Sequence, residues 1–125
     1  MGAMTENVLD TTIPTLRITK IEAALPTYAA LGFSVAWQHQ LAPDAPRLTS
    51  VRHGAAELFL TEHPVAPVGA VVYFVTRGVD ALVARAAAAG VEPSFGPEER
   101  PWWDREVYFR DLDGNVLRFG QALDP

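Results

Sequence analysis

The chain of 125 residues contains no cysteine, which excludes disulfide bonds, zinc–thiolate sites and thiol nucleophiles. Basic residues are also few, because ten of them stand against fifteen acidic residues and give a formal net charge of −5. A nucleic-acid partner is therefore not expected, since such proteins present a basic face. No apolar run approaches the ~20 residues of a membrane span, and the first residues do not resemble a secretion signal. We expect a cytoplasmic protein with no membrane partner.

The composition is that of a small globular protein. The chain is 49% hydrophobic and 20% charged, which is ordinary for a protein with a packed core, and its length suits one compact domain. We therefore expect a single domain over residues 4–125, leaving out the three residues that precede the second methionine.

Two periodicities alternate in the first half of the chain. Residues 20–31 carry apolar side chains at helical spacing. Pro26 fits only the first turn of a helix, so we expect this helix to begin near Glu22, and Gly32 is a natural end for it. A period of two residues predicts strands over residues 11–19, 33–39, 47–52 and 57–61.

The second half follows the same order. An alanine-rich helix is predicted over residues 79–89, and the Asp113–Gly114 pair is typical of a hairpin turn. Residues 96–104, which are rich in proline and tryptophan, are predicted to form a loop. The expected strands cover residues 70–76, 91–95, 105–110 and 115–121.

The two halves are related in sequence as well as in pattern. Thr19–Lys20 aligns with Thr76–Arg77, and the glycines that end the helices align too, at an offset of about 57 to 58 residues. We therefore expect an α+β fold of two βαβββ modules, about residues 11–62 and 69–121, with a helix behind each curved sheet. A concave sheet surface of this kind is a natural place for a ligand.

Three separated segments carry a family resemblance. Ile13–Ile18 is similar to its opening strand, Tyr28–Phe33 to its helix end, and Arg110–Asn115 to the hairpin before its last strand. In this order and spacing they resemble the vicinal-oxygen-chelate (glyoxalase/bleomycin resistance) superfamily, which includes glyoxalase I, extradiol dioxygenases, fosfomycin-resistance enzymes and bleomycin-binding proteins. The resemblance implies the glyoxalase/bleomycin resistance fold and a homodimer that exchanges its N-terminal strand, which Pro14 suits.

Narrower matches resemble the bleomycin-binding subgroup. They are Trp37 shortly after Gly32–Ser34, the segment Arg77–Leu82, and above all Pro101–Glu106. In that subgroup a tryptophan lines the drug groove, which implies such a role for Trp102. The chain departs from the pattern by one extra residue after this tryptophan, and it has fewer carboxylates around residues 33–40, so a different planar antibiotic is also compatible with it.

The metal ligands that the resemblance implies are missing from this sequence. Their positions fall near Ile13, near Val71 and at Arg118, and none of these side chains coordinates a metal; arginine is a permanent cation. No spacing groups the three histidines, residues 39, 53 and 63, into a ligand shell. We therefore expect no metal, no cofactor and no catalytic residue. The alternatives are a metal-dependent lyase, dioxygenase or thiol transferase of the same superfamily, or a binder of an unrelated small ligand.

The predicted function is to confer resistance by sequestering an antibiotic, either a bleomycin-family glycopeptide, with or without its bound metal, or a similar planar drug. Aromatic surfaces would stack on flat heterocycles, and carboxylates would hold a cationic end. The predicted ligand-binding residues are Trp37, His39, Phe59, Trp102, Trp103, Tyr108 and Arg118. One tryptophan of the adjacent pair is expected to meet the ligand and the other to pack. Arg118 is expected to bind an anion or to pair with Glu57 or Glu106.

Overall fold

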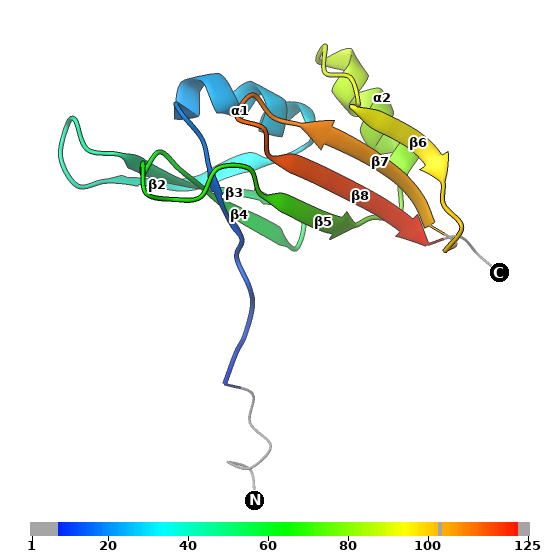
Figure 1. Ribbon diagram of the computed structural model, residues 1–125, viewed down its shortest axis with the longest axis horizontal. Helices are drawn as coiled ribbons and strands as arrows, with labels where there is room; N and C mark the ends of the chain where they lie inside the picture. The colour runs from blue at the N-terminus through cyan, green and yellow to red at the C-terminus, as the bar shows by residue number, and fades with distance from the viewer. Residues whose placement is uncertain (1–7, 103, 123–125) are drawn as a thin grey trace, which may run out of the picture.

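The computed structural model describes residues 8–102 and 104–122. It contains two four-stranded sheets, each with one helix (Figure 1). The first module consists of β1 (Thr15–Arg17), α1 (Ile21–Ala30), β2 (Ser34–Gln40), β3 (Arg47–His53) and β4 (Ala56–Thr61). The second module consists of β5 (Val71–Val75), α2 (Val79–Ala88), β6 (Phe95–Glu99), β7 (Asp104–Arg110) and β8 (Val116–Ala122). The predicted α+β fold of two βαβββ modules is confirmed.

The two sheets have the same topology. Their strand orders are β1-β4-β3-β2 and β5-β8-β7-β6. In each sheet the first strand pairs in parallel with the last strand of its module, and the other pairs are antiparallel. Both helices have ten residues, and their bounds differ by the offset that the aligned halves predict. The repeat seen in the sequence is therefore a repeat of structure.

The first strand is shorter than predicted. Its ladder with β4 covers only Thr15–Arg17, although the alternating pattern predicts residues 11–19. The preceding segment extends away from the body of the chain (Figure 1), and the side chains of Val8 and Leu9 are 93% and 81% exposed. The pattern gave the wrong length because alternation cannot show how many residues find a pairing partner.

The prediction for β6 was wrong in position. The strand covers Phe95–Glu99 rather than residues 91–95, so all of it except Phe95 lies within the segment predicted to be a loop. Its register shifts between Phe95 and Glu98, and this irregularity accommodates a proline, which a regular ladder does not. Gly96 has φ +76°, and a Cβ atom there would lie 2.5 Å from the carbonyl oxygen of Glu106. Only glycine permits this close approach of β6 to β7.

The first helix begins one residue before the predicted start, at Ile21. Pro26 therefore lies inside the helix and not in its first turn, contrary to the expectation. The proline is exposed, and the carbonyl that loses its hydrogen-bond donor belongs to the exposed Glu22. Water can satisfy that carbonyl, so the kink penalty is small on this side of the helix.

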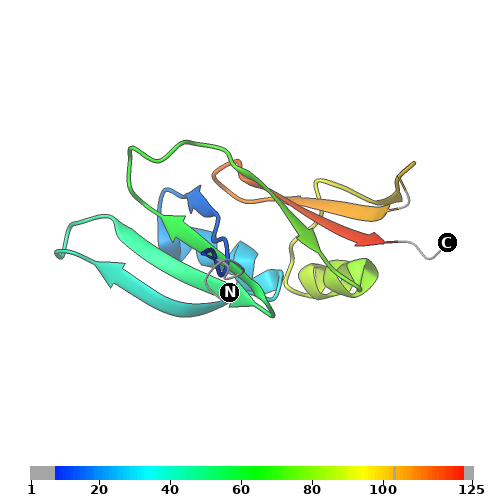
Figure 2. The ribbon, with the colours of Figure 1, turned by 90° about the horizontal axis from the view of Figure 1, so that it is seen from below.

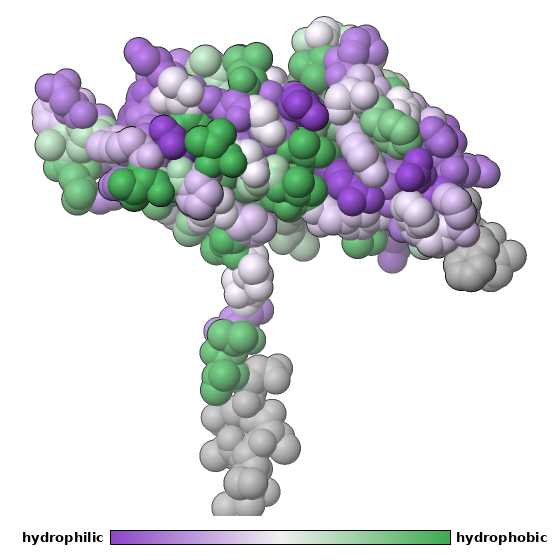
Figure 3. Space-filling view, in the orientation of Figure 1, coloured by the Kyte–Doolittle hydropathy of each residue, from purple (hydrophilic) through white to green (hydrophobic). Residues whose placement is uncertain are grey.

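One hydrophobic core joins the two modules. Leu16, Leu58 and Leu60 from the first sheet and Val107 and Phe109 from the second belong to a single buried cluster. Because side chains alternate across a strand, the neighbours of these residues lie on the opposite face of each sheet, which no helix of the described chain covers (Figure 2). The side of the molecule seen in Figure 1 mixes apolar and polar residues over both sheets (Figure 3). Within the described residues, no helix is long and apolar enough to cross a membrane.

Each helix is capped by a side chain at the end of its own sheet. Glu62 Oε2 accepts a 3.0 Å hydrogen bond from the backbone N–H of Ile21, and Gln121 Oε1 accepts one of 3.0 Å from Val79 N–H. Arg47 also donates to Glu62 at 2.7–3.1 Å, from Nε and Nη2. The bonds to Ile21 and Val79 satisfy N–H groups that a helix leaves unpaired at its start.

We expect the Glu62→Gln substitution to lower the free energy of unfolding by about 1–2 kcal/mol, measured by urea denaturation at neutral pH. The hydrogen bonds from Arg47 outweigh burial and lower the pKa of Glu62 below 4.5. A carboxyl with a lowered pKa stabilises the fold above its unfolded pKa, and this contribution is lost as the pH falls below about 4.5 through the folded pKa. The Glu62→Gln protein should lack this part of the acid dependence, and an unchanged profile would contradict the assignment.

Candidate ligand-binding site

The register of the second sheet gathers polar and aromatic residues on its uncovered face. Tyr73 on β5 pairs with Arg118 on β8, and Arg118 pairs with Tyr108 on β7. Glu106 lies two residues before Tyr108 on the same strand and therefore on the same face. These four side chains converge although they come from three strands.

Glu106 is the centre of this group. Its side chain is 1% exposed. Oε1 accepts hydrogen bonds from Arg118 Nη2 at 3.0 Å and Tyr108 OH at 3.1 Å, and Oε2 accepts from Trp102 Nε1 at 3.2 Å and Tyr73 OH at 3.3 Å. Tyr73 OH has one hydrogen and also lies 3.0 Å from Asp104 Oδ2, so it donates to only one of these two carboxylates at a time. Arg118, Tyr108 and Trp102 therefore occupy three of the roughly four acceptor positions of Glu106. Burial alone would raise the pKa of Glu106, but the hydrogen bonds from Arg118, Trp102 and Tyr108 outweigh it and lower that pKa.

Stacked guanidinium groups and aromatic rings close this group into a cycle. The Arg118 guanidinium lies 4.7 Å from the Tyr108 ring centroid, and the Tyr108 ring lies 4.8 Å from that of Phe95. The Arg100 guanidinium lies 5.1 Å from the Phe95 ring and 4.8 Å from the Trp102 ring, and Trp102 donates to Glu106. We call these residues the Glu106 ring; its members are Glu106, Arg118, Tyr108, Phe95, Arg100 and Trp102.

The Glu106 ring is partly exposed and not fully satisfied. Trp102 is 47% exposed and the neighbouring Tyr73 is 42% exposed. The Nε atoms of Arg118 and Arg100 are buried, and no residue that the structure describes accepts a hydrogen bond from either. A buried unpaired donor costs about 1–3 kcal/mol. Exposed aromatic rings next to buried donors without an acceptor are typical of a binding surface rather than of a core.

The first sheet presents a smaller aromatic surface. The Trp37 and Phe59 rings meet edge to face with centroids 5.2 Å apart, and Trp37 remains 39% exposed. A bulge between Val35 and Trp37 shifts the register of β2 against β3, and bulges of this kind re-aim the side chains of a strand. His39 lies two residues further along the same strand and is exposed.

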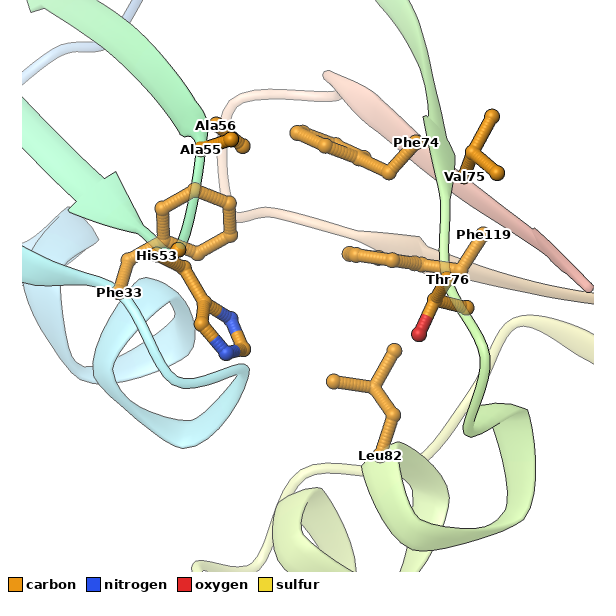
Figure 4. Close-up of a pocket in the computed structure, with 10 residues that line it drawn as sticks. Phe33, His53, Ala55, Ala56, Phe74, Val75, Thr76, Leu82 and Phe119 are labelled. Atoms are coloured by element: carbon orange, nitrogen blue, oxygen red, sulfur yellow. The ribbon is translucent and has the colours of Figure 1, made fainter.

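An apolar pocket of about 260 Å³ lies between the modules. Phe33 and His53 of the first module face Phe74, Phe119 and Leu82 of the second across it (Figure 4). The rings of Phe74 and Phe119 stack with centroids 4.7 Å apart. None of the sequence-predicted site residues lines this pocket, and its described lining includes no Asp, Glu, Lys or Arg. The charged groups of Glu106, Arg118 and Arg100 lie on the face of the second sheet and not in this pocket.

The sequence profile of the Glyoxalase/Bleomycin resistance protein/Dioxygenase superfamily matches residues 9–119. The chain belongs to this superfamily. The match spans both modules and the uncovered faces of both sheets, and it agrees with the resemblance of the three sequence segments. Among curated proteins, none matches the chain in sequence.

Solved structures of this superfamily share the fold of the whole chain. A bleomycin-binding protein complexed with bleomycin has a TM-score of 0.72 at 18% identity, covering 91% of this chain and 99% of the other. A bleomycin resistance determinant encoded on the transposon Tn5 has a TM-score of 0.73 at 19% identity, covering 91% and 98%. TnmS3, an antibiotic binding protein from Streptomyces sp. CB03234, has a TM-score of 0.74 at 27% identity, covering 94% and 99%.

Arg118 occupies one of the positions at which the resemblance implies a metal ligand. Arg118 is paired with Glu106 at 3.0 Å. Of the two carboxylates that the sequence left open for it, Glu57 and Glu106, the partner is therefore Glu106. Within residues 8–102 and 104–122, no three His, Asp or Glu side chains are grouped as metal ligands. His53 Nδ1 lies 3.0 Å from the carbonyl oxygen of Leu31, and His63 Nδ1 accepts a 3.3 Å hydrogen bond from Val65 N–H.

The predicted site residues form two groups. The structure brings Trp37 and Phe59 together on the first sheet, and it brings Trp102, Tyr108 and Arg118 together on the second. His39 shares the strand of the first group. No hydrogen bond or ring contact joins the two groups among the described residues, and Trp103 lies outside those residues.

Sequence reasoning missed Tyr73, Phe95 and Arg100 as site residues and left the role of Glu106 open. The alternation of β5 was available as a signal for Tyr73, because residues 71, 73 and 75 share one face. No such signal existed for Phe95 or Arg100, since the strand that carries Phe95 was predicted to end there and Arg100 was predicted to lie in a loop.

Proposed function

We propose that this superfamily member binds a planar antibiotic on the uncovered sheet faces and confers resistance by sequestering the drug without modifying it. The observation that carries the proposal is the Glu106 ring, which holds Trp102, Tyr108 and Phe95 in fixed positions around one buried carboxylate. Rigid, half-exposed aromatic rings bind flat ligands with little loss of conformational entropy. The solved structures of a bleomycin-binding protein and of TnmS3, whose names describe antibiotic binding, support it.

Binding without chemistry is favoured by what the site contains. Arg118 stands where the superfamily resemblance places a glutamate ligand, and a guanidinium group cannot coordinate a cation. Glu106, the carboxylate nearest to it, is 1% exposed and accepts hydrogen bonds from Arg118, Tyr108 and Trp102, with Tyr73 OH 3.3 Å from its Oε2. It is therefore not available as a general base, because a base needs an acceptor position that faces the substrate.

The proposed active form is a homodimer. The face of the second sheet is open in one chain, and a second copy would bring the Trp37–Phe59 surface of its first module over it as the other wall of a groove. The segment 8–14, with its exposed Val8 and Leu9, extends away from the body of the chain (Figure 1), as an exchanged segment would. Exposed apolar side chains on an extended segment are suited to such an exchange.

The test is a tryptophan fluorescence titration with four drugs: bleomycin, its Cu(II) complex, actinomycin D and nalidixic acid, a planar carboxylic acid. At least one is expected to quench saturably with a micromolar Kd, and mass spectrometry should recover that drug unmodified. Light scattering of the same sample should give the mass of a dimer. Absence of saturable quenching with all four drugs, or recovery of a modified drug, would refute the proposal.

Two variants distinguish binding to the aromatic surface from nonspecific binding to exposed apolar side chains. The Trp102→Ala substitution is expected to weaken drug binding about tenfold or more, because stacking aromatic anchors are worth over 1 kcal/mol. Leu112→Ala removes another exposed apolar side chain, 73% exposed, from the hairpin before β8, and it should leave the affinity unchanged. Equal affinities of the two variants would remove Trp102 from the site.

A further inference from the structure

We propose that the face of the second module selects planar ligands that carry an acidic group next to the ring, and not ligands with a cationic group. This inference rests on the proposed function and names the ligand class that the Glu106 ring fits. It differs from the expectation drawn from the sequence, in which carboxylates of the protein hold a cationic end of the drug.

The buried carboxylate of this face has little capacity left for a cation. Glu106 is 1% exposed and accepts hydrogen bonds from Arg118, Tyr108 and Trp102. Tyr73 OH lies 3.0 Å from Asp104 Oδ2 and 3.3 Å from Glu106 Oε2, and it donates its single hydrogen to one of these two carboxylates. A cationic ligand group would therefore meet two carboxylates with free capacity, Asp104 and Glu98, and Glu98 already lies 3.7 Å from Arg100. It would also meet the guanidinium groups of Arg100 and Arg118, which carry its own sign.

The guanidinium groups of Arg118 and Arg100, in contrast, have N–H donors that no described residue accepts. Among the described residues, Glu106 is the one acceptor bonded to the Arg118 side chain, through Nη2. The ion pair from Arg100 Nη1 to Glu98 is 3.7 Å long, which is beyond hydrogen-bond distance. Both arginines stack on aromatic rings, so their planes are fixed. Arg118 and Arg100 keep 31% and 25% of their side chains exposed.

A fixed guanidinium edge beside an aromatic surface matches a flat acid. The ligand ring would stack against Trp102 or Tyr108, and its carboxylate would lie in the plane of Arg118, where a bidentate pair forms. The low polarity of the surrounding rings strengthens this pair. The net charge of −5 does not oppose it at this range, because charges more than about 8 Å apart are screened at physiological ionic strength.

The experiment compares three ligands that share a naphthalene ring and carry a negative, a neutral or a positive substituent. Binding of 2-naphthoate, 2-naphthamide and 2-naphthylmethylammonium to the full chain is measured by isothermal titration calorimetry at neutral pH. The naphthoate is expected to bind about tenfold more tightly than the amide, as a charge-assisted pair requires, and the ammonium compound should bind most weakly. An ammonium compound that binds as tightly as the naphthoate, or a series in which no compound binds, would overturn the inference.

The variants assign the preference to Arg118. Removing Arg118 alone would leave the buried Glu106 unpaired, so Arg118→Met is combined with Glu106→Met, which keeps the volume of both side chains. The preference for the acid should fall to about threefold or less. Arg85→Met on α2 removes the same charge from the helix side of the sheet and should keep the preference. A preference that survives in the double variant would contradict the assignment.

The two proposals can fail separately. If antibiotics bind saturably but the naphthalene series shows no preference for the acid, the charge selection is wrong and the proposed function stands. If the naphthoate binds with the expected preference and none of the antibiotics binds, the ligand class is supported and sequestration of those drugs is not. If neither set binds, both proposals fail.

Discussion

Replacing Glu106 with alanine is expected to lower the free energy of unfolding by about 3 kcal/mol. The substitution removes the partner of Arg118, whose side chain is only 31% exposed, and it takes the acceptor from Tyr108, Tyr73 and Trp102. The value lies toward the lower end for buried ion pairs because Arg118 can be partly hydrated once its partner is gone. Urea denaturation at neutral pH measures it.

The double variant Glu106→Met with Arg118→Met is the control for this prediction. Replacing both charges with apolar side chains of similar volume is often close to neutral, so the double variant should lose no more than about 1 kcal/mol. If the double variant is as unstable as the Glu106→Ala protein, the lost stability comes from packing and not from the unpaired charge.

The stability that Glu106 provides is also expected to depend on pH. Its pKa is lowered from the ordinary value of 4.5, so in the folded protein the carboxylate stays charged to a lower pH than in the unfolded chain. The contribution is complete above the unfolded pKa and is lost as the pH falls below about 4.5 toward the folded pKa. The double variant should lack this part of the acid dependence.

The second large effect is expected at Asp111. This carboxylate is 5% exposed and accepts from Tyr28 OH at 2.7 Å, from the backbone N–H groups of Asp113 and Asn115, and from the Asn115 side chain. Asn115 in turn donates to the carbonyl of Arg17 at 2.9 Å. The network therefore ties α1 and β1 of the first module to the β7–β8 turn of the second.

The Asp111→Ala substitution should lower the free energy of unfolding by about 3–4 kcal/mol, because it leaves several buried donors without a partner. Tyr28→Phe removes one of these bonds and should cost about 1–2 kcal/mol. Asp113→Ala in the same turn, which loses bonds to the exposed Thr19, should cost no more than about 1 kcal/mol. Thermal and urea unfolding rank the three variants, and a cost at Asp113 that equals the cost at Asp111 would refute the role given to burial.

Local patterns were sufficient for most of the elements. The bounds of both helices, the glycine that ends each of them, and the strands that alternate cleanly all follow from contacts between near neighbours in the sequence. Periodicity failed where a partner strand decides the outcome. The length of β1 depends on how much of β4 is available to it, and β6 depends on the close approach of Gly96 to β7.

The candidate site was predicted in part. The residue types that line it, Trp102, Tyr108 and Arg118, could be chosen from the sequence because aromatic rings and an arginine stand out at those positions. Their convergence on Glu106 could not be derived, since it depends on the pairing of β7 with β8 and of β8 with β5. Neither pairing is visible from the spacing of residues along the chain.

The sequence by itself determined the two βαβββ modules and the repeat that relates them, because these depend on residue identity and local periodicity. The resemblance to the superfamily added that Arg118 stands where that family has a metal-binding glutamate. Only the tertiary structure decided which carboxylate Arg118 pairs with and that this buried carboxylate also accepts hydrogen bonds from Tyr108 and Trp102. The reason is physical: hydrogen bonds and cation–π contacts depend on distances between residues far apart in the chain, and strand register sets those distances.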